Sequence, residues 1–307
     1  MKKLIVGLVI VILVVLGIYF ITKSPANTPV TPVPDVTTPG NIPLVTSTTT
    51  LPTPTNPDQT VIGQSVEGRD IVAYHYGQGA TELLFIGGIH GGYEWNTALV
   101  AYQTMDYLKR KPGVIPSNVK VTVIPVLNPD GLAKVIGTTT TGIFSPTDVA
   151  SSQETQVAGR FNGNKVDLNR NFDCDWQTSA TWQNKKVSGG TAAFSEPESR
   201  AIKNYVETSK PKAVVTWYSS AGGVFASSCH NGVSPETNTL TKTFAKASGY
   251  PPHESFDFYA ITGDLVNWLA KENIPAISVL LTNHTDTEWS KNQAGIEAVL
   301  KYYARTQ

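Results

Sequence analysis

Short runs rich in valine, isoleucine and leucine alternate with amphipathic segments from residue 61 to residue 307, and no other feature of the sequence constrains the fold as strongly. Such runs, bounded by polar segments, predict strands that are buried on both faces of a sheet. The predicted strands are Ile71–Tyr76, Glu82–Gly87, Lys120–Val126, Ala213–Trp217 and Ala276–Leu281. The predicted helices are Trp95–Lys109, Glu196–Thr208, Glu236–Ser248, Thr262–Lys271 and Ser290–Ala304. Strands separated by helices predict an α/β fold, a three-layer α/β/α sandwich around a mixed, mostly parallel twisted sheet.

The N-terminal part of the chain has a different composition. Residues 4–22 are uncharged and almost entirely apolar, and a helix of about 20 such residues spans the hydrocarbon core of a bilayer. Lys2 and Lys3 precede this run, which predicts a single transmembrane anchor over residues 1–23 with its N-terminus inside the cell. A cleaved signal peptide is the alternative, although its apolar region is usually shorter.

Residues 24–60 are rich in proline and threonine and poor in charge, a composition that cannot bury a core. They predict a disordered linker that holds an extracytoplasmic domain, residues 61–307, away from the membrane. The whole chain has a formal net charge of zero and only 16% charged residues. Because it has no basic stripe to neutralise phosphates, the sequence excludes nucleic acid as a partner.

Cys174 and Cys229 are the two cysteines of the chain, and both fall in the part predicted to be exported. An even pair in an oxidising compartment predicts a disulfide. On the chain-entropy model, a bridge that closes a loop of this length stabilises the fold by about 4 kcal/mol. Two buried free thiols are the alternative.

Residues 87–95, with the sequence GGIHGGYEW, follow a predicted strand and precede a predicted helix. In open α/β sheets, ligands bind beyond the carboxyl ends of the strands. A neutral His90 and the carboxylate of Glu94 can face the same cation from such a turn, and zinc accepts both kinds of ligand. On its own, however, a histidine near a glutamate is more often incidental.

Residues 160–172, with the sequence RFNGNKVDLNRNF, contain two arginines ten residues apart and several asparagines. Arg160 and Arg170 therefore indicate a compact cationic surface with many hydrogen-bond donors. An arginine can hold a carboxylate through two parallel hydrogen bonds, so this segment predicts recognition of an acidic group. A solvated charge pair that stabilises a loop is the alternative.

Together these segments resemble the zinc metallocarboxypeptidases of the carboxypeptidase A type. The most specific match is residues 167–172, DLNRNF, and residues 62–71 and 259–264 also match. The resemblance covers essentially all of residues 61–307, and it implies one bound zinc ion. It also implies removal of a C-terminal residue by metal-activated water.

The resemblance assigns roles to individual residues. His90 and Glu94 correspond to the first two zinc ligands, and Arg160 to the arginine that stabilises the oxyanion. The expected clamp on the C-terminal carboxylate of the substrate consists of Asn169, Arg170 and Tyr259. Val266 falls at the position that, in this family, contacts the side chain of the substrate's C-terminal residue. An uncharged residue there argues against a substrate with a basic C-terminal residue.

The sequence departs from the family pattern at three places. Three residues rather than two separate His90 from Glu94. Tyr218 stands where the third ligand, a histidine, is expected, and a phenol is not among the usual ligands of zinc. Leu280 stands where the catalytic glutamate is expected, although a different gap placement would put Leu281 there. Because neither leucine can accept a proton, we expect hydrolysis to be impaired.

Three functional hypotheses follow. The first is a degenerate carboxypeptidase homologue that recognises C-terminal carboxylates of peptides or peptidoglycan stems. The second is an active zinc carboxypeptidase in which His230 or His284 substitutes for the third ligand. The third is a non-catalytic surface scaffold. The sequence leaves the oligomeric state open.

Overall fold

The computed structural model describes residues 58–137 and 144–305. The predicted anchor and most of the predicted linker lie outside these ranges, so both stay predictions. None of the helices within the described ranges is long and apolar enough to cross a membrane.

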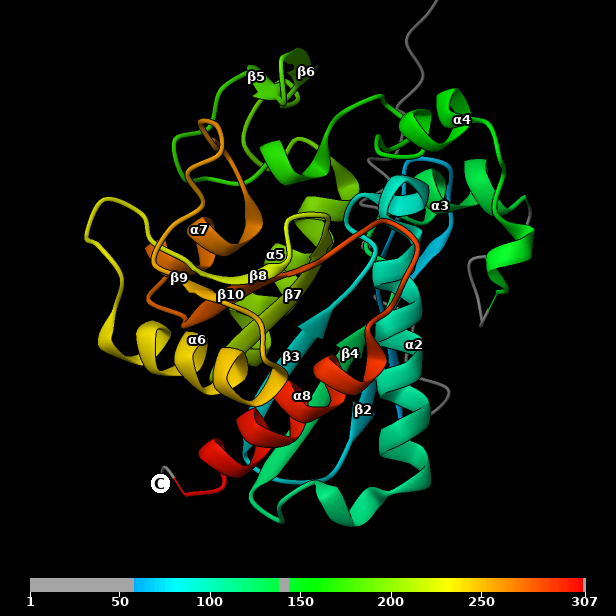
Figure 1. Cartoon of the computed structure of the whole chain (residues 1–307). Coiled ribbons are helices and arrows are strands. Elements are labelled where there is room, and N and C mark those ends of the chain that lie inside the picture. The colour runs from blue at the N-terminus through cyan, green and yellow to red at the C-terminus, as the bar shows by residue number, and fades with distance from the viewer. Residues whose placement is uncertain (1–57, 138–143, 306–307) are drawn as a thin grey trace, which may run out of the picture. The chain divides into compact units, whose positions relative to one another are not determined.

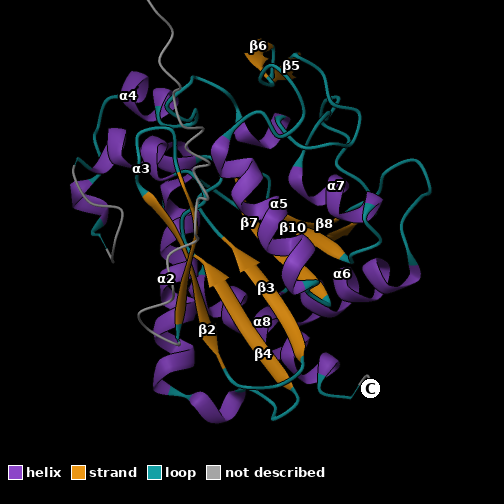
Figure 2. Ribbon diagram, turned by 180° about the vertical axis from the view of Figure 1, so that it is seen from behind, coloured by secondary structure: helices purple, strands orange, loops and turns teal. Residues whose placement is uncertain are grey.

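In the described part of the chain, an eight-stranded mixed sheet runs in the order β1-β2-β4-β3-β7-β10-β8-β9. Its four central strands, β4, β3, β7 and β10, are parallel, and antiparallel pairs join them to β2 and to β8 (Figure 2). The bounds are β1 Gln59–Gln64, β2 Asp70–Tyr76, β3 Thr81–Ile86, β4 Val119–Ile124, β7 Ala213–Ser219, β8 Gly223–Ala226, β9 Pro252–His253 and β10 Ala276–Leu281.

Helices cover both faces of this sheet (Figure 1). On one face, α2, α6 and α8 pack against side chains such as Leu83 and Phe85 of β3. On the other face, α5 and α7 pack against Leu84 and Ile86, the intervening residues of the same strand. Because successive side chains of a strand point to opposite faces of the sheet, the buried strand β3 contributes side chains to both cores. The helices are α2 Trp95–Arg110, α3 Pro129–Ile136, α4 Gln153–Ala158, α5 Pro197–Ser209, α6 Pro235–Ser248, α7 Leu265–Lys271 and α8 Trp289–Tyr303.

The predicted three-layer α/β sandwich is confirmed, and each predicted strand and helix has a counterpart within a few residues. The sequence analysis did not predict β1, β8, β9, α3 or α4, which are short. It also did not predict a separate hairpin formed by β5 (Ser179–Trp182) and β6 (Lys185–Ser188). This hairpin has its own small apolar cluster, apart from the two cores that flank the sheet.

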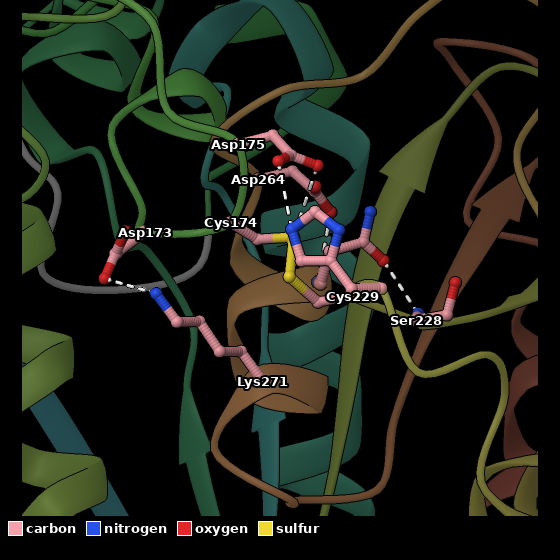
Figure 3. Close-up of a disulfide and its surroundings, with 9 residues drawn as sticks. Asp173, Cys174, Asp175, Ser228, Cys229, Asp264 and Lys271 are labelled. Atoms are coloured by element: carbon pink, nitrogen blue, oxygen red, sulfur yellow. Dashed lines mark hydrogen bonds and ion pairs between the residues drawn. A yellow bond between two sulfur atoms is a disulfide. The ribbon is translucent and has the colours of Figure 1, made fainter.

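A disulfide joins Cys174 to Cys229, which are 55 residues apart in sequence and 6.2 Å apart between their Cα atoms. It connects the segment that follows residues 168–170 to the loop that follows β8 (Figure 3). A third segment is held to the bridge, because the backbone N–H of Gly263 donates to the carbonyl of Cys174 over 2.7 Å. The disulfide therefore holds together three loops that come from distant parts of the chain.

Replacing both Cys174 and Cys229 by serine should lower the free energy of unfolding by about 4 kcal/mol, because the unfolded chain regains the entropy of an open loop. Urea denaturation followed by tryptophan fluorescence measures this loss, and the wild type under reducing conditions should show a similar one. Equal denaturation midpoints for the oxidised wild type and the double variant would contradict the prediction.

Candidate functional site

A cavity of about 760 Å³ lies where the parallel strands β3, β7 and β10 end. Ligand sites of open α/β sheets form at this edge, because the loops that follow neighbouring strands meet there. Its wall brings together most of the site residues that the sequence analysis named, with His230 as an exception: His90, Glu94, Arg160, Asn169, Arg170, Tyr218, Tyr259, Val266, Leu280 and His284.

His90 and Glu94 meet across a single 3-10 turn, Gly91–Glu94. Gly91 has a φ of 45°, and a Cβ there would lie 2.6 Å from the carbonyl oxygen of Gly159, so only glycine fits. This turn accommodates the extra residue between His90 and Glu94 and leaves His90 Nδ1 2.9 Å from Glu94 Oε1.

The imidazole of His90 is buried without satisfied hydrogen bonds. Nδ1 approaches Glu94, and Nε2 lies 3.4 Å from Asp167 Oδ1. These short distances describe proximity only, because neither ring nitrogen has a partner with hydrogen-bond geometry among the described residues. Buried polar atoms are normally paired, so the unpaired imidazole beside a carboxylate fits the first two ligands of a metal ion.

Arg160 is fixed by a buried ion pair and by two aromatic rings. Its Nε donates to Asp167 Oδ2 over 2.9 Å, and its guanidinium lies 4.3 Å from the ring centre of Trp182 and 5.7 Å from that of Tyr93. Burial alone would raise the pKa of Asp167, but Arg160 and His90 outweigh burial and hold that pKa well below its usual range. Asp167 is therefore ionised, and Arg160 has a permanent counter-charge.

Tyr218 occupies the position of the expected third ligand. It lies on β7 directly beside Leu280 of β10, and its hydroxyl donates to Asn169 Oδ1 over 3.2 Å. Burial, followed by the nearby carboxylates of Asp264 and Glu94, raises the pKa of Tyr218 well above its usual value. The phenol is therefore neutral and serves as a hydrogen-bond donor.

The described residues do not fit the three-ligand catalytic zinc site of the family. Leu280 offers only a buried aliphatic side chain at the position of the general base. His230 is exposed beside the disulfide, 3.1 Å from Asp175, and so lies at a different place from the cavity. His284 does line the cavity, but Ser219 and Ser220 contact its ring nitrogens. Within the described ranges, the one cluster of three metal-donor residues is Cys174, Cys229 and His230, whose sulfurs are bonded to each other.

The predicted carboxylate clamp is held rigidly by the main chain. Arg170 Nη1 donates to the carbonyl of Asn169 over 2.7 Å, and Nη2 donates to the carbonyl of Thr181 over 3.0 Å. The guanidinium lies 5.9 Å from the ring centre of Tyr259. Asn169 accepts hydrogen bonds through Oδ1, so its amide nitrogen is left to face a ligand. The clamp is pre-organised before any ligand binds.

Asp264 is a site residue that the sequence analysis missed. Its Oδ2 caps α7, whereas its buried Oδ1 has no hydrogen-bond partner in the described part of the chain. It lines the same cavity as Val266 and lies close to the disulfide (Figure 3). Burial raises the pKa of Asp264 to about 6, and Arg170 opposes the rise. An aspartate just before a helix usually signals only a cap, which explains why it was overlooked.

Comparison with known proteins identifies the family. The zinc carboxypeptidase family profile matches residues 53–303, so the chain belongs to the zinc carboxypeptidase family. The gamma-D-glutamyl-L-diamino acid endopeptidase 1 of Lysinibacillus sphaericus is 26% identical over 66% of this chain and 55% of the relative. The catalytic chain of human carboxypeptidase N is 26% identical over 64% of this chain and 40% of that protein. The chain therefore spans about half the length of these curated relatives.

Solved structures share the fold at low sequence identity. The murein-tripeptide amidase of Escherichia coli O157 superposes with a TM-score of 0.56 at 18% identity, over 81% of this chain and 92% of that one. Thrombin-activatable fibrinolysis inhibitor superposes with a TM-score of 0.64 at 16% identity, over 81% of this chain and 69% of that one. These likenesses agree with the three-layer architecture.

Replacing Tyr218 by histidine should add an imidazole beside His90 and Glu94 and raise the zinc retained after dialysis toward about one ion per chain. Elemental analysis of the purified protein measures the retained zinc. Tyr218→Phe is the matched control, because it removes the hydroxyl without adding a ligand. A wild-type protein that already retains as much zinc as Tyr218→His would refute this account of the site.

Proposed function

We propose that this protein recognises the C-terminal carboxylate of peptides or peptidoglycan stems and hydrolyses them poorly, if at all, by the metal-dependent route of its family. One observation carries the proposal. The cavity wall holds Asn169 and Arg170, the residues of the proposed clamp, and it holds Tyr218 and Leu280 where the family resemblance expects the third ligand and the general base.

The charges in the cavity support anion binding. Arg160 has its own buried counter-ion in Asp167, whereas the acceptors bonded to Arg170 are backbone carbonyls, and no carboxylate of the described residues forms an ion pair with it. A bound carboxylate would supply the missing counter-charge and complete the guanidinium's hydrogen bonds. Charge-assisted hydrogen bonds of this kind are about twice as strong as neutral ones.

The hydrolytic machinery is weakened in two separate ways. First, a metal ion would have His90 and Glu94 as protein ligands but no third ligand, so zinc, which would activate water there, would be bound poorly. A positioned general base typically contributes about 10²–10⁴-fold to the rate, and leucine contributes nothing of this kind. Tyr218, as a neutral donor to Asn169, supports the clamp instead.

Asp264 suggests which terminal residues fit. Its unpaired Oδ1 lies in the same cavity as Arg170, so the wall presents an acid in addition to the cation of the clamp. A terminal residue with a carboxylate and a side-chain amino group would satisfy both. This assignment agrees with the names of two relatives, a gamma-D-glutamyl-L-diamino acid endopeptidase and a murein-tripeptide amidase. Val266 lines the cavity as predicted, but its lack of charge does not decide the specificity.

The proposed location is the outer side of a membrane, through a single-pass anchor over residues 1–23. The uncharged run at residues 4–22 behind Lys2 and Lys3 supports this proposal. So does the disulfide, because disulfides persist mainly in exported proteins.

Replacing Arg170 by alanine should weaken binding of a peptide with a free C-terminus about 10–100-fold, because a charged hydrogen bond contributes about 1.5–3 kcal/mol. Isothermal titration calorimetry with free and C-terminally amidated forms of one peptide measures the effect. Arg110→Ala, which changes an exposed arginine on α2, is the matched control. Equal affinity of the wild type for the two peptide forms would rule out carboxylate recognition.

Replacing Asp264 by asparagine should abolish a preference for C-terminal lysine over norleucine. Lowering the pH from 7 to 5 should weaken binding of the lysine peptide to the wild type about tenfold, because an acid with a pKa of about 6 is mostly protonated at pH 5. Calorimetry at both pH values gives the ratio of the two affinities.

The norleucine peptide controls for the other charged groups near the cavity. The raised pKa of Tyr218 keeps it neutral across this range, and His284 affects both peptides alike. A lysine preference that is unchanged in Asp264→Asn, or that grows at pH 5, would exclude Asp264 as the group that selects the side chain.

A further inference from the structure

A chain of hydrogen bonds runs along one wall of the cavity through groups that the carboxylate clamp does not use. Ser219 Oγ lies 3.2 Å from Asn96 Oδ1 and 2.8 Å from His284 Nδ1. Ser220 Oγ lies 3.2 Å from the other ring nitrogen of the same histidine, Nε2. These residues come from α2, from the end of β7 and from the loop that follows β10.

The direction of the protons along this chain follows from Asn96. Its amide nitrogen donates to the carbonyls of Asn283 and Asp286 over 2.8 and 2.9 Å, so the amide oxygen is the atom that faces Ser219. An amide oxygen only accepts, and therefore the single hydroxyl proton of Ser219 points toward Asn96.

The tautomer of His284 is then determined. Because Ser219 has no second proton to give, the hydrogen between Ser219 Oγ and His284 Nδ1 must belong to the imidazole. The opposite nitrogen, Nε2, therefore has a free lone pair, and the hydroxyl of Ser220 is the group that can donate to it. This is the arrangement of a nucleophile, a base and a group that orients the base.

The surroundings agree with these roles. Ser220 is exposed, whereas Ser219 and Asn96 are buried, so the hydroxyl next to Nε2 is the one that a ligand can reach. The ring of His284 packs 4.8 Å from that of Tyr93, whose other contacts include the guanidinium of Arg160. Arg160 and Ser220 both line this cavity.

We infer that Ser220 is a nucleophile and His284 its general base, and that they give this cavity a metal-independent acyl-transfer activity toward esters or amides. Ser220 Oγ bonds to the carbonyl carbon while its proton passes to His284 Nε2 and the carbonyl electron pair moves onto oxygen. When this intermediate collapses, the bond to the leaving amine or alcohol breaks, and His284 returns the proton to it.

Water completes the cycle. It attacks the acyl-serine while His284 takes its proton, the ester bond breaks, and Ser220 leaves with that proton as the carboxylic acid is released. This activity goes beyond the proposed recognition of C-termini, since peptide binding at Arg170 requires no acylation.

Labelling of the full-length protein with diisopropyl fluorophosphate, followed by intact mass spectrometry and peptide mapping, tests the inference. We expect one adduct, on Ser220, formed equally well with and without a metal chelator. Ser220→Ala should remove the adduct, and His284→Ala should slow its formation at least about 100-fold. Ser219→Ala should slow adduct formation less, because this change removes the hydroxyl that orients His284 but leaves the imidazole in place.

Ser255→Ala, which changes another serine in the cavity wall, is the matched control and should label like the wild type. The labelling uses no peptide, so its outcome is independent of the calorimetry that tests the recognition of carboxylates. An adduct on any other serine, or labelling of the wild type no faster than that of His284→Ala, would overturn the inference.

Discussion

The buried carboxylate of Asp167 holds the parts of the cavity in place. It forms the ion pair with Arg160, lies beside the imidazole of His90, and accepts a hydrogen bond from the backbone of Asn169. One ionised group therefore fixes an arginine, a candidate ligand and the start of the clamp. Removing one partner of a buried ion pair leaves an uncompensated charge, so none of these positions can change independently of the others.

Residues of the cavity wall that do not contact Asp167 are free of this dependence. Tyr218 and Leu280 lie side by side on β7 and β10, in the middle of the sheet, and both pack in the core. Neither makes a bond to Asp167 in the described structure. Arg160, Asp167 and Arg170 thus lie outside the strands of the sheet, whereas Tyr218 and Leu280 belong to β7 and β10.

Much of this structure could be predicted from the sequence, because the information is local. Valine-rich runs and amphipathic segments gave the central strands and the larger helices. The family resemblance, carried most specifically by the segment DLNRNF, pointed to Asn169, Arg170, Tyr218 and Leu280, which line one cavity, while their roles stay predictions. The parts that were missed depend on contacts between distant residues. Trp182 covers Arg160 from a short hairpin, and Asp264 looks like an ordinary helix cap. The bonds of Ser219 to Asn96 and His284 span 123 and 65 residues, and no local pattern encodes them. The membrane anchor stays a prediction.

The β5–β6 hairpin stands apart from both cores, yet it carries the indole that covers Arg160. Outside its own two strands, a single bridge between Val166 and Ser188 ties it to the described structure by strand pairing. Insertions or exchanges in this hairpin would leave the eight-stranded sheet and its helices almost unaffected, while they would change the surface that covers Arg160. Descendants of this chain could therefore acquire new ligands by remodelling a few surface residues, at little risk to folding.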